Sequence, residues 1–139
     1  MAAPNSTSTI HPSNLATNQA IRLLAVATGV NVNSTGDQAT LAINNASSYS
    51  VSNVVFTNAS ISLSTAAAGL FTAPSAGGTG IVANAALSAL SASTVVSQRT
   101  VASTALQTAQ NLYLNVGTAQ GAAATMDVYV YGYDFSTFS

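Results

Sequence analysis

Short stretches in which apolar and polar residues alternate recur along most of the chain, and Gly, Asn, Ser or Pro residues separate them. A period of two residues is typical of β-strands with one buried face. The pattern predicts strands at residues 20–27, 39–43, 49–57, 94–102, 111–116 and 125–133, and a half-buried strand around Ile61 and Leu63. We therefore expect an all-β fold, an antiparallel sandwich or barrel, over residues 19–139.

The connections between these strands carry recognisable turn signals. The sequence NSTGD at 33–37 predicts a turn, and the glycine-rich PSAGGTG at 74–80, between two short apolar runs, predicts a hairpin. A shift in the alternation near Asn53 indicates a β-bulge. Residues 83–91 fit either a short helix, because two leucines lie about one helical turn apart, or an irregular crossing, because serine weakens a helix.

The first 18 residues differ from the rest of the chain. They are rich in Ser, Thr and Asn, and Pro4 and Pro12 interrupt them. We expect an extended N-terminal arm at residues 1–18, which either frays or becomes ordered against a neighbouring subunit.

The last two strands are divided into an aliphatic face and a polar or aromatic face. The side chains expected to face the core are Leu112, Leu114, Val116, Met126, Val128 and Val130. Those expected to face outward are Tyr113, Asn115, Asp127, Tyr129, Tyr131 and Tyr133.

Tyrosines in an outward row favour contact with another protein, because Tyr combines a large apolar area with a polar tip and is enriched at interfaces. An ordinary outer sheet face with cross-strand aromatic pairs is the simpler alternative. We predict that the interface residues are Tyr113, Tyr129, Tyr131, Tyr133 and Phe135.

Charge is unusually scarce, which narrows the classes of partner. Only 4% of the residues are Asp, Glu, Lys or Arg, against about 25% in an ordinary soluble domain, and the net charge is −1. Such a composition favours association with other subunits. With Arg22 and Arg99 as the only cations besides the chain terminus, we expect no binding to nucleic acid or anionic lipid. There is no signal-peptide pattern and no run of about 18 apolar residues, so we expect no membrane segment.

Residues able to support catalysis or metal binding are almost absent. His11 is the only histidine and lies in the arm beside Pro12, and the chain has neither Cys nor Glu. The carboxylates are Asp37, which reads as a turn residue, Asp127, expected to pair with Arg22 or Arg99 or to face solvent, and Asp134. We therefore predict that the protein is not an enzyme and has no metal ion or cofactor.

Several segments resemble small structural proteins that are encoded beside the major capsid protein in tailed-phage genomes. The resemblance covers about two thirds of the chain, from Asp37 onward, and is closest over VVFTNASISLSTAAAGLFTA and LYLNVGTAQGAAATMDVYVYGYDF. Its markers are TNAS after an aliphatic strand, AAAGLFTA, the GG turn, TAQGAAAT and the closing VYVYGYDF. Residues 1–36 have no counterpart in it.

The resemblance implies a head decoration or cement protein. Such a protein is a β-sandwich of jelly-roll-like form, commonly a homotrimer, that binds the major capsid protein on the exterior of the phage head. The alternative is a tail or fibre module that binds a host-surface glycan, with the tyrosines stacked on sugar rings.

Overall fold

Eight antiparallel β-strands and no helix make up the part of the chain that the computed structural model describes, residues 21–136. The strands are β1 (Arg22–Asn31), β2 (Gly36–Ala42), β3 (Tyr49–Thr57), β4 (Ala67–Ala73), β5 (Gly77–Ala86), β6 (Val96–Arg99), β7 (Asn111–Thr118) and β8 (Thr125–Asp134). The all-β prediction is confirmed. The expected arm at residues 1–18 lies outside the described residues.

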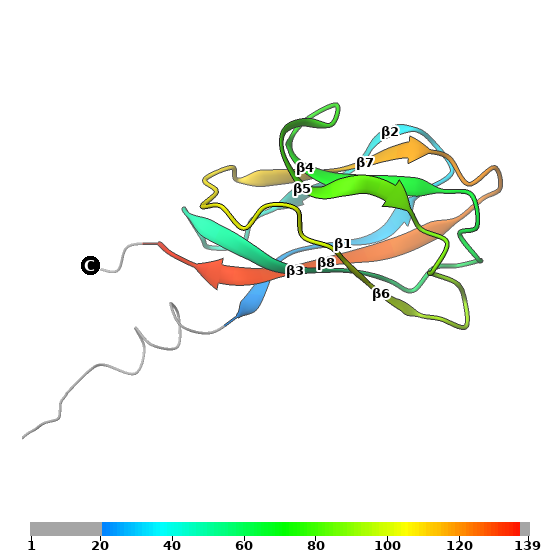
Figure 1. Cartoon of the computed structure of the whole chain (residues 1–139), viewed down its shortest axis with the longest axis horizontal. Coiled ribbons are helices and arrows are strands. Elements are labelled where there is room, and N and C mark those ends of the chain that lie inside the picture. Colours follow the sequence, from blue (N-terminus) through cyan, green and yellow to red (C-terminus); the bar gives the residue numbers. More distant parts are fainter. Residues whose placement is uncertain (1–20, 137–139) are drawn as a thin grey trace, which may run out of the picture.

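The strands form two four-stranded sheets that pack face to face as a β-sandwich (Figure 1). One sheet has the order β1-β8-β3-β6 and the other has the order β2-β7-β4-β5. Only β4 and β5 are consecutive in the chain and adjacent in one sheet; every other connection crosses between the sheets. The two ends of the described chain lie side by side, because Arg22 pairs with Gly132 near the end of β8.

The core lies between the two sheets and is built from one face of each strand. In β8, residues from Met126 onward alternate between buried and half-exposed, and in β7 the buried positions are Leu112, Leu114 and Val116. The inward and outward faces predicted for these two strands are therefore confirmed. Phe56 of β3 and Leu70 of β4 are also fully buried.

Three of the predicted local features are present. The register between β3 and β8 shifts between Val51 and Asn53, which is the expected bulge. β4 and β5 form the expected hairpin, with Ser75 and Ala76 in the left-handed region at φ 58°. The turn after β1 ends at Gly36, whose φ of 94° is easily reached only by glycine.

Two other predictions fared differently. The strand expected around Ile61 and Leu63 was wrong, because neither residue belongs to a strand. Of the two alternatives for residues 83–91, the helix was wrong, whereas the irregular crossing is present after Ala86, where β5 ends. The reason is local pairing, since the N–H of Leu63 donates to the Leu90 carbonyl oxygen and that of Leu87 to Ala66. The leucines of these irregular segments, Leu63, Leu87 and Leu90, are fully buried, although the segments extend no sheet.

Two strand boundaries also differ from the prediction. The strand expected at 94–102 is limited to Val96–Arg99, and the first strand continues past Ala27 to Asn31. In β1, two register shifts, one of them next to Gly29 at φ 62°, reset the alternation and let the strand go on pairing with β8. No helix among residues 21–136 is long and apolar enough to span a membrane.

Candidate interaction surface

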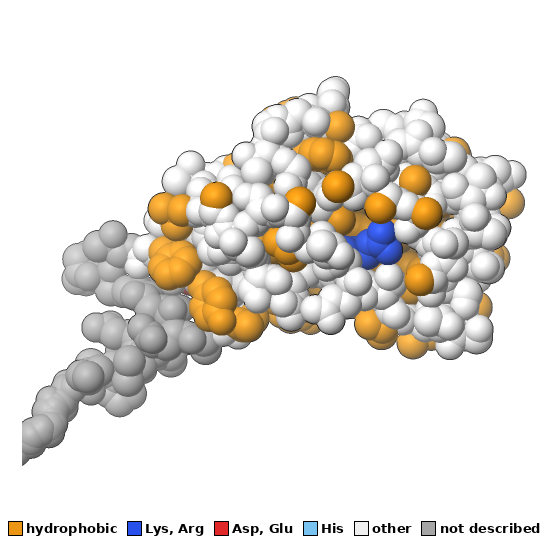
Figure 2. All heavy atoms as spheres, viewed as in Figure 1, with side chains coloured by type: hydrophobic (Ala, Val, Ile, Leu, Met, Phe, Trp, Pro, Cys, Tyr) orange, Lys and Arg blue, Asp and Glu red, His pale blue; other side chains and the backbone are white. Residues whose placement is uncertain are grey.

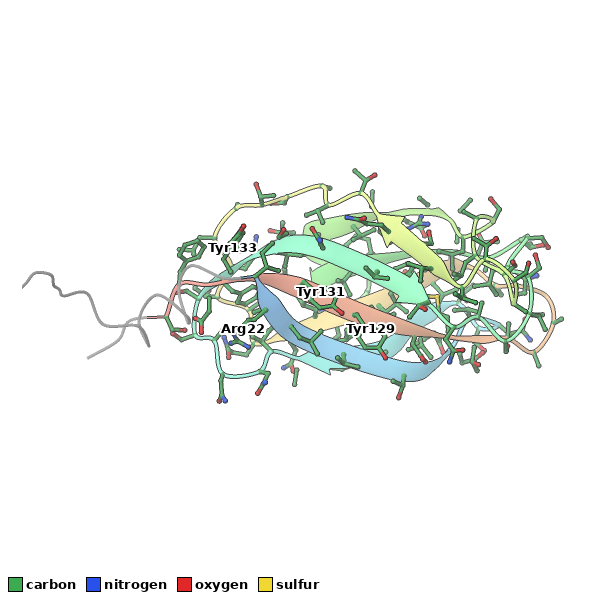
Figure 3. The ribbon with its side chains drawn as sticks, turned by 90° about the horizontal axis from the view of Figure 1, so that it is seen from below. Arg22, Tyr129, Tyr131 and Tyr133 are labelled. Atoms are coloured by element: carbon green, nitrogen blue, oxygen red, sulfur yellow. The ribbon has the colours of Figure 1, made fainter. Side chains whose placement is uncertain are left out.

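The outward tyrosines of β8 lie along the centre of one outer sheet face. β8 runs between β1 and β3, and Figure 3 shows Tyr129 and Tyr131 on the exposed side of this sheet, with Tyr133 near the strand end. All three side chains are partly exposed, while the residues between them are buried. Strand alternation alone therefore presents three phenols to the outside.

Aliphatic side chains on the neighbouring strands extend this row across the sheet. Leu23 and Val26 of β1 are paired with Tyr131 and Tyr129, and each is 39% exposed. On the other side, Val55 of β3 is paired with Tyr129. Directly paired residues in antiparallel strands point to the same side of the sheet. We call this surface the tyrosine face; it consists of Leu23, Val26, Val55, Tyr129, Tyr131 and Tyr133.

The apolar surface extends past the tyrosine face, beyond the end of β8. Phe135 is 49% exposed, and its ring centroid lies 6.4 Å from that of Tyr133 with a tilt of 36°. Figure 2 shows apolar side chains gathered at this end of the molecule. Four of the five predicted interface residues, Tyr129, Tyr131, Tyr133 and Phe135, therefore lie on one continuous surface.

Tyr113 does not lie on this surface. It points outward from β7 in the second sheet, where it is paired with Phe71 of β4 and Thr40 of β2. The outer faces of two packed sheets are on opposite sides of a sandwich. Tyr113 therefore cannot share one flat contact with the other four residues.

The charged groups next to the tyrosine face are held by partners within the chain. Asp127 accepts hydrogen bonds from the Gly29 N–H at 2.8 Å and from the Asn58 side-chain amide at 3.0 Å. The predicted ion pair of Asp127 with Arg22 or Arg99 was wrong, because Arg22 reaches Asp134 instead, with 3.3 Å between Nη2 and Oδ2.

Asp134 is almost fully buried, and its environment favours the ionised form. Burial raises the pKa of this carboxyl, but hydrogen bonds from Ser136 and the nearby Arg22 guanidinium outweigh burial and lower it overall. The Arg22 guanidinium also donates to the carbonyl oxygens of Asn44 and Asn45. This network ties the end of β8 to the start of β1 and leaves the tyrosine face without a free charge.

The fifth tyrosine of the chain is structural. Tyr49 at the start of β3 is fully buried, and its hydroxyl donates to the Ala109 carbonyl oxygen at 2.6 Å. Burial raises the pKa of Tyr49 to about 12. Tyr49 lies on the inward face of β3 together with Val51, Val54 and Phe56.

Groups that could support chemistry are separated. Asp37 was predicted to be a turn residue, but it belongs to β2, where it is paired with Asn115 of β7. Its carboxylate accepts hydrogen bonds from the Ser75 N–H and the Asn115 side chain, both at 2.8 Å. No cluster of three or more His, Cys, Asp or Glu side chains occurs among residues 21–136. His11 lies outside the described residues.

Sequence reasoning missed the aliphatic members of the tyrosine face. Leu23 and Leu24 are adjacent in the sequence, and the bulge after Leu23 decides which of them is buried. Val55 lies in a run of consecutive apolar residues, so alternation alone does not show that it faces outward; the register shift at Asn53 determines which residues of this run face the core.

Comparison of the chain with protein-family models, curated proteins and solved structures gives no match.

Proposed function

We propose that this chain is a decoration protein of a tailed-phage head, which binds the outer surface of the shell through the tyrosine face and stabilises it. The observation that carries the proposal is the tyrosine face itself. It joins three tyrosines of β8 to aliphatic side chains of the neighbouring strands β1 and β3. The charged groups beside it have partners within the chain: Arg22 and Asp134 form an ion pair, and Asp127 accepts hydrogen bonds.

Such a surface suits contact with protein. The central parts of protein interfaces are depleted in charge and enriched in Tyr and Phe, which bury a large area with few rotatable bonds. A chain with only five Asp, Glu, Lys and Arg residues has little else to keep an apolar face dispersed in water. Burial against another protein removes this face from solvent.

The strand order supports a jelly roll, which is the finer architecture that we propose. Eight strands arranged as β1-β8-β3-β6 and β2-β7-β4-β5, with nearly every connection crossing between sheets, correspond to two interlocked Greek keys. Double-sheet jelly rolls occur in viral capsid domains and in lectin domains. The architecture thus agrees with the resemblance of residues 37–139 to small head proteins.

Stabilisation of the shell would follow from mass action. A protein that binds only the assembled lattice lowers the free energy of that lattice by RT ln(1 + [L]/Kd), about 4 kcal/mol per site at a thousandfold excess over Kd. Repetition over many sites makes modest single contacts sufficient. In this proposal the copies form trimers, and the partner is the major capsid protein.

Truncation of the central tyrosine tests the proposal. Tyr131→Ala should weaken binding to heads assembled without this protein by roughly tenfold or more, which corresponds to a loss of about 1.4 kcal/mol or more on truncation of an interface residue. Tyr113→Ala is the matched control, because it makes the same truncation on the opposite side of the sandwich. It should leave the affinity for heads nearly unchanged.

Binding should be measured by co-sedimentation with heads, and the free energy of unfolding by urea titration. If Tyr131→Ala loses as much folding free energy as binding free energy, the tyrosine face is an ordinary outer sheet face and not an interface. Binding of host glycans, but not of heads, would instead favour the tail or fibre module.

A further inference from the structure

Arg99 occupies the open edge of the sandwich, where β6 of one sheet lies beside β5 of the other. Its Nη2 donates to the Ala86 carbonyl oxygen of β5 at 3.0 Å, and its Nη1 donates to Ser97 Oγ at 3.2 Å. The guanidinium carbon lies 5.3 Å from the centroid of the buried Phe56 ring. The positively charged guanidinium of Arg99 therefore lies over the Phe56 ring at the edge of the core.

This cation has no carboxylate partner among residues 21–136. That range contains all three side-chain carboxylates of the chain, and the one ion pair in it joins Arg22 to Asp134. Nε of Arg99 is inaccessible and has no hydrogen-bond partner within the described residues. Each of the two Nη groups carries two N–H donors and makes one hydrogen bond within the described residues, so each retains one donor for a further acceptor.

Burial makes this unpaired charge unfavourable. Removal of the guanidinium from water lowers the pKa of Arg99, because the charged form loses hydration that no nearby anion replaces. In a chain with so few charges, a neutral side chain could cover Phe56 without this cost. An anion from outside the chain would offset this unfavourable burial of the Arg99 charge.

Two hollows meet at Arg99 and give such an anion access. One, of about 350 Å³, has a largely aliphatic lining that includes Val82, Ala85 and Ala89. The other, of about 520 Å³, is shallow and is lined, besides Arg99, mainly by polar residues: Ser52, Gln98, Thr100 and Thr104, together with Val101. In Figure 2 the visible cationic atoms lie in a hollow between the positions of β5 and β6, and no acidic side chain is visible on that face.

We propose that Arg99 and the polar hollow beside it form a carboxylate-binding site that accepts one Asp or Glu side chain of a different protein. A single guanidinium flanked by neutral donors matches one carboxylate. It does not match a nucleic acid or an anionic lipid surface, which need several cations.

We assign the acid to a protein of another sequence, because the side-chain carboxylates of this chain, Asp37, Asp127 and Asp134, already accept hydrogen bonds within their own chain. The identification of this partner as the shell subunit rests on the proposed function. The proposal that Arg99 binds a carboxylate does not depend on that function.

The test of the chemistry uses NMR of the ¹⁵N-labelled full chain. Because the chain has two arginines, its side-chain Nε–Hε signals number two, and Arg22 serves as the internal control. Titration with N-acetyl-glutamate N-methylamide should shift the Arg99 signal, with saturation at about millimolar concentrations or above. The matching glutamine compound should leave the signal in place.

An Arg99 signal that does not move, or that moves equally with the glutamine compound, would overturn the site. A tighter response to glucuronate than to the glutamate compound would overturn the assignment to a protein side chain. Because these titrations use the unaltered chain, they do not depend on the folding of a variant.

The source of the carboxylate is tested on heads assembled without this protein. Arg99→Met keeps an apolar stem over Phe56 and should weaken binding by about 10- to 100-fold, as expected for loss of a charge-assisted hydrogen bond. Arg99→Lys should weaken it less. Unchanged binding of both variants would overturn a role for Arg99 in that contact. If the unaltered chain shows the glutamate shift but binds no heads, the proposed function fails and the carboxylate site stands.

Discussion

Replacement of Tyr49 by Phe should change how stability depends on pH at the alkaline end. The Tyr49 hydroxyl is buried and donates to the Ala109 carbonyl oxygen at 2.6 Å. Burial raises its pKa to about 12, whereas a tyrosine in the unfolded chain ionises near pH 10. Between these values the folded state holds a proton that the unfolded state releases. The stability contributed by this proton is therefore complete below pH 10 and is lost as the pH rises toward 12.

The size of the effect follows from the two pKa values. Relative to pH 8, the unaltered protein should lose about 1.4 kcal/mol of unfolding free energy through Tyr49 at pH 11 and about 2.3 kcal/mol at pH 12. Tyr49→Phe cannot lose this contribution, because it has no hydroxyl. At pH 8 the variant should be less stable by about 1 kcal/mol, owing to the lost hydrogen bond. The two stability curves should therefore cross near pH 11.

Urea unfolding followed by far-UV circular dichroism, at several pH values from 8 to 11.5, measures both curves. Tyr131→Phe is the matched control, since it removes a hydroxyl from the tyrosine face rather than from the core. A stability difference between the unaltered protein and Tyr49→Phe that stays constant over this range would refute the reasoning.

Three further predictions concern the network at the end of β8, backbone packing and salt. Stability should fall as the pH drops below about 4, because the lowered pKa of Asp134 contributes stability that is lost on protonation; urea titration should show a shallower fall in Asp134→Asn. Gly132→Ala should lower the unfolding free energy by about 2 kcal/mol or more, because its Cβ would collide with the Ser50 carbonyl oxygen; thermal unfolding checks this, and an unchanged melting temperature would contradict it. Head binding measured by co-sedimentation should weaken by less than about tenfold between about 0.05 and 0.5 M salt, because the tyrosine face is uncharged and Arg99 adds no more than one ion pair; a steeper loss would count against that face as the main contact.

The faces of β7 and β8 were predictable because their aliphatic and polar residues alternate without a break. With strict alternation, only one assignment of the two faces is possible, and it places Val128 and Val130 inside and Tyr129 and Tyr131 outside. Alternation alone does not assign the faces of β1. Its two register shifts depend on how it pairs with β8, so the exposure of Leu23 and Val26 could not be read from the local pattern.

The sequence also could not predict which segments that are distant in the chain lie on the same side of the sandwich. Tyr113 and Tyr131 occupy similar outward positions in their strands, yet they lie on opposite sides because β7 and β8 belong to different sheets. That Arg99 forms no ion pair among residues 21–136 depends on where the three Asp side chains lie after folding. Sheet order decides both facts, and short apolar runs are compatible with several antiparallel orders.

Cryo-electron microscopy of virions with and without this protein tests the central claim most directly. We expect added density at regular positions on the head exterior, with the β1-β8-β3-β6 sheet turned toward the shell and Tyr131 buried in the contact. Density on the tail alone, or a head-bound protein whose tyrosine face points into solvent, would contradict it.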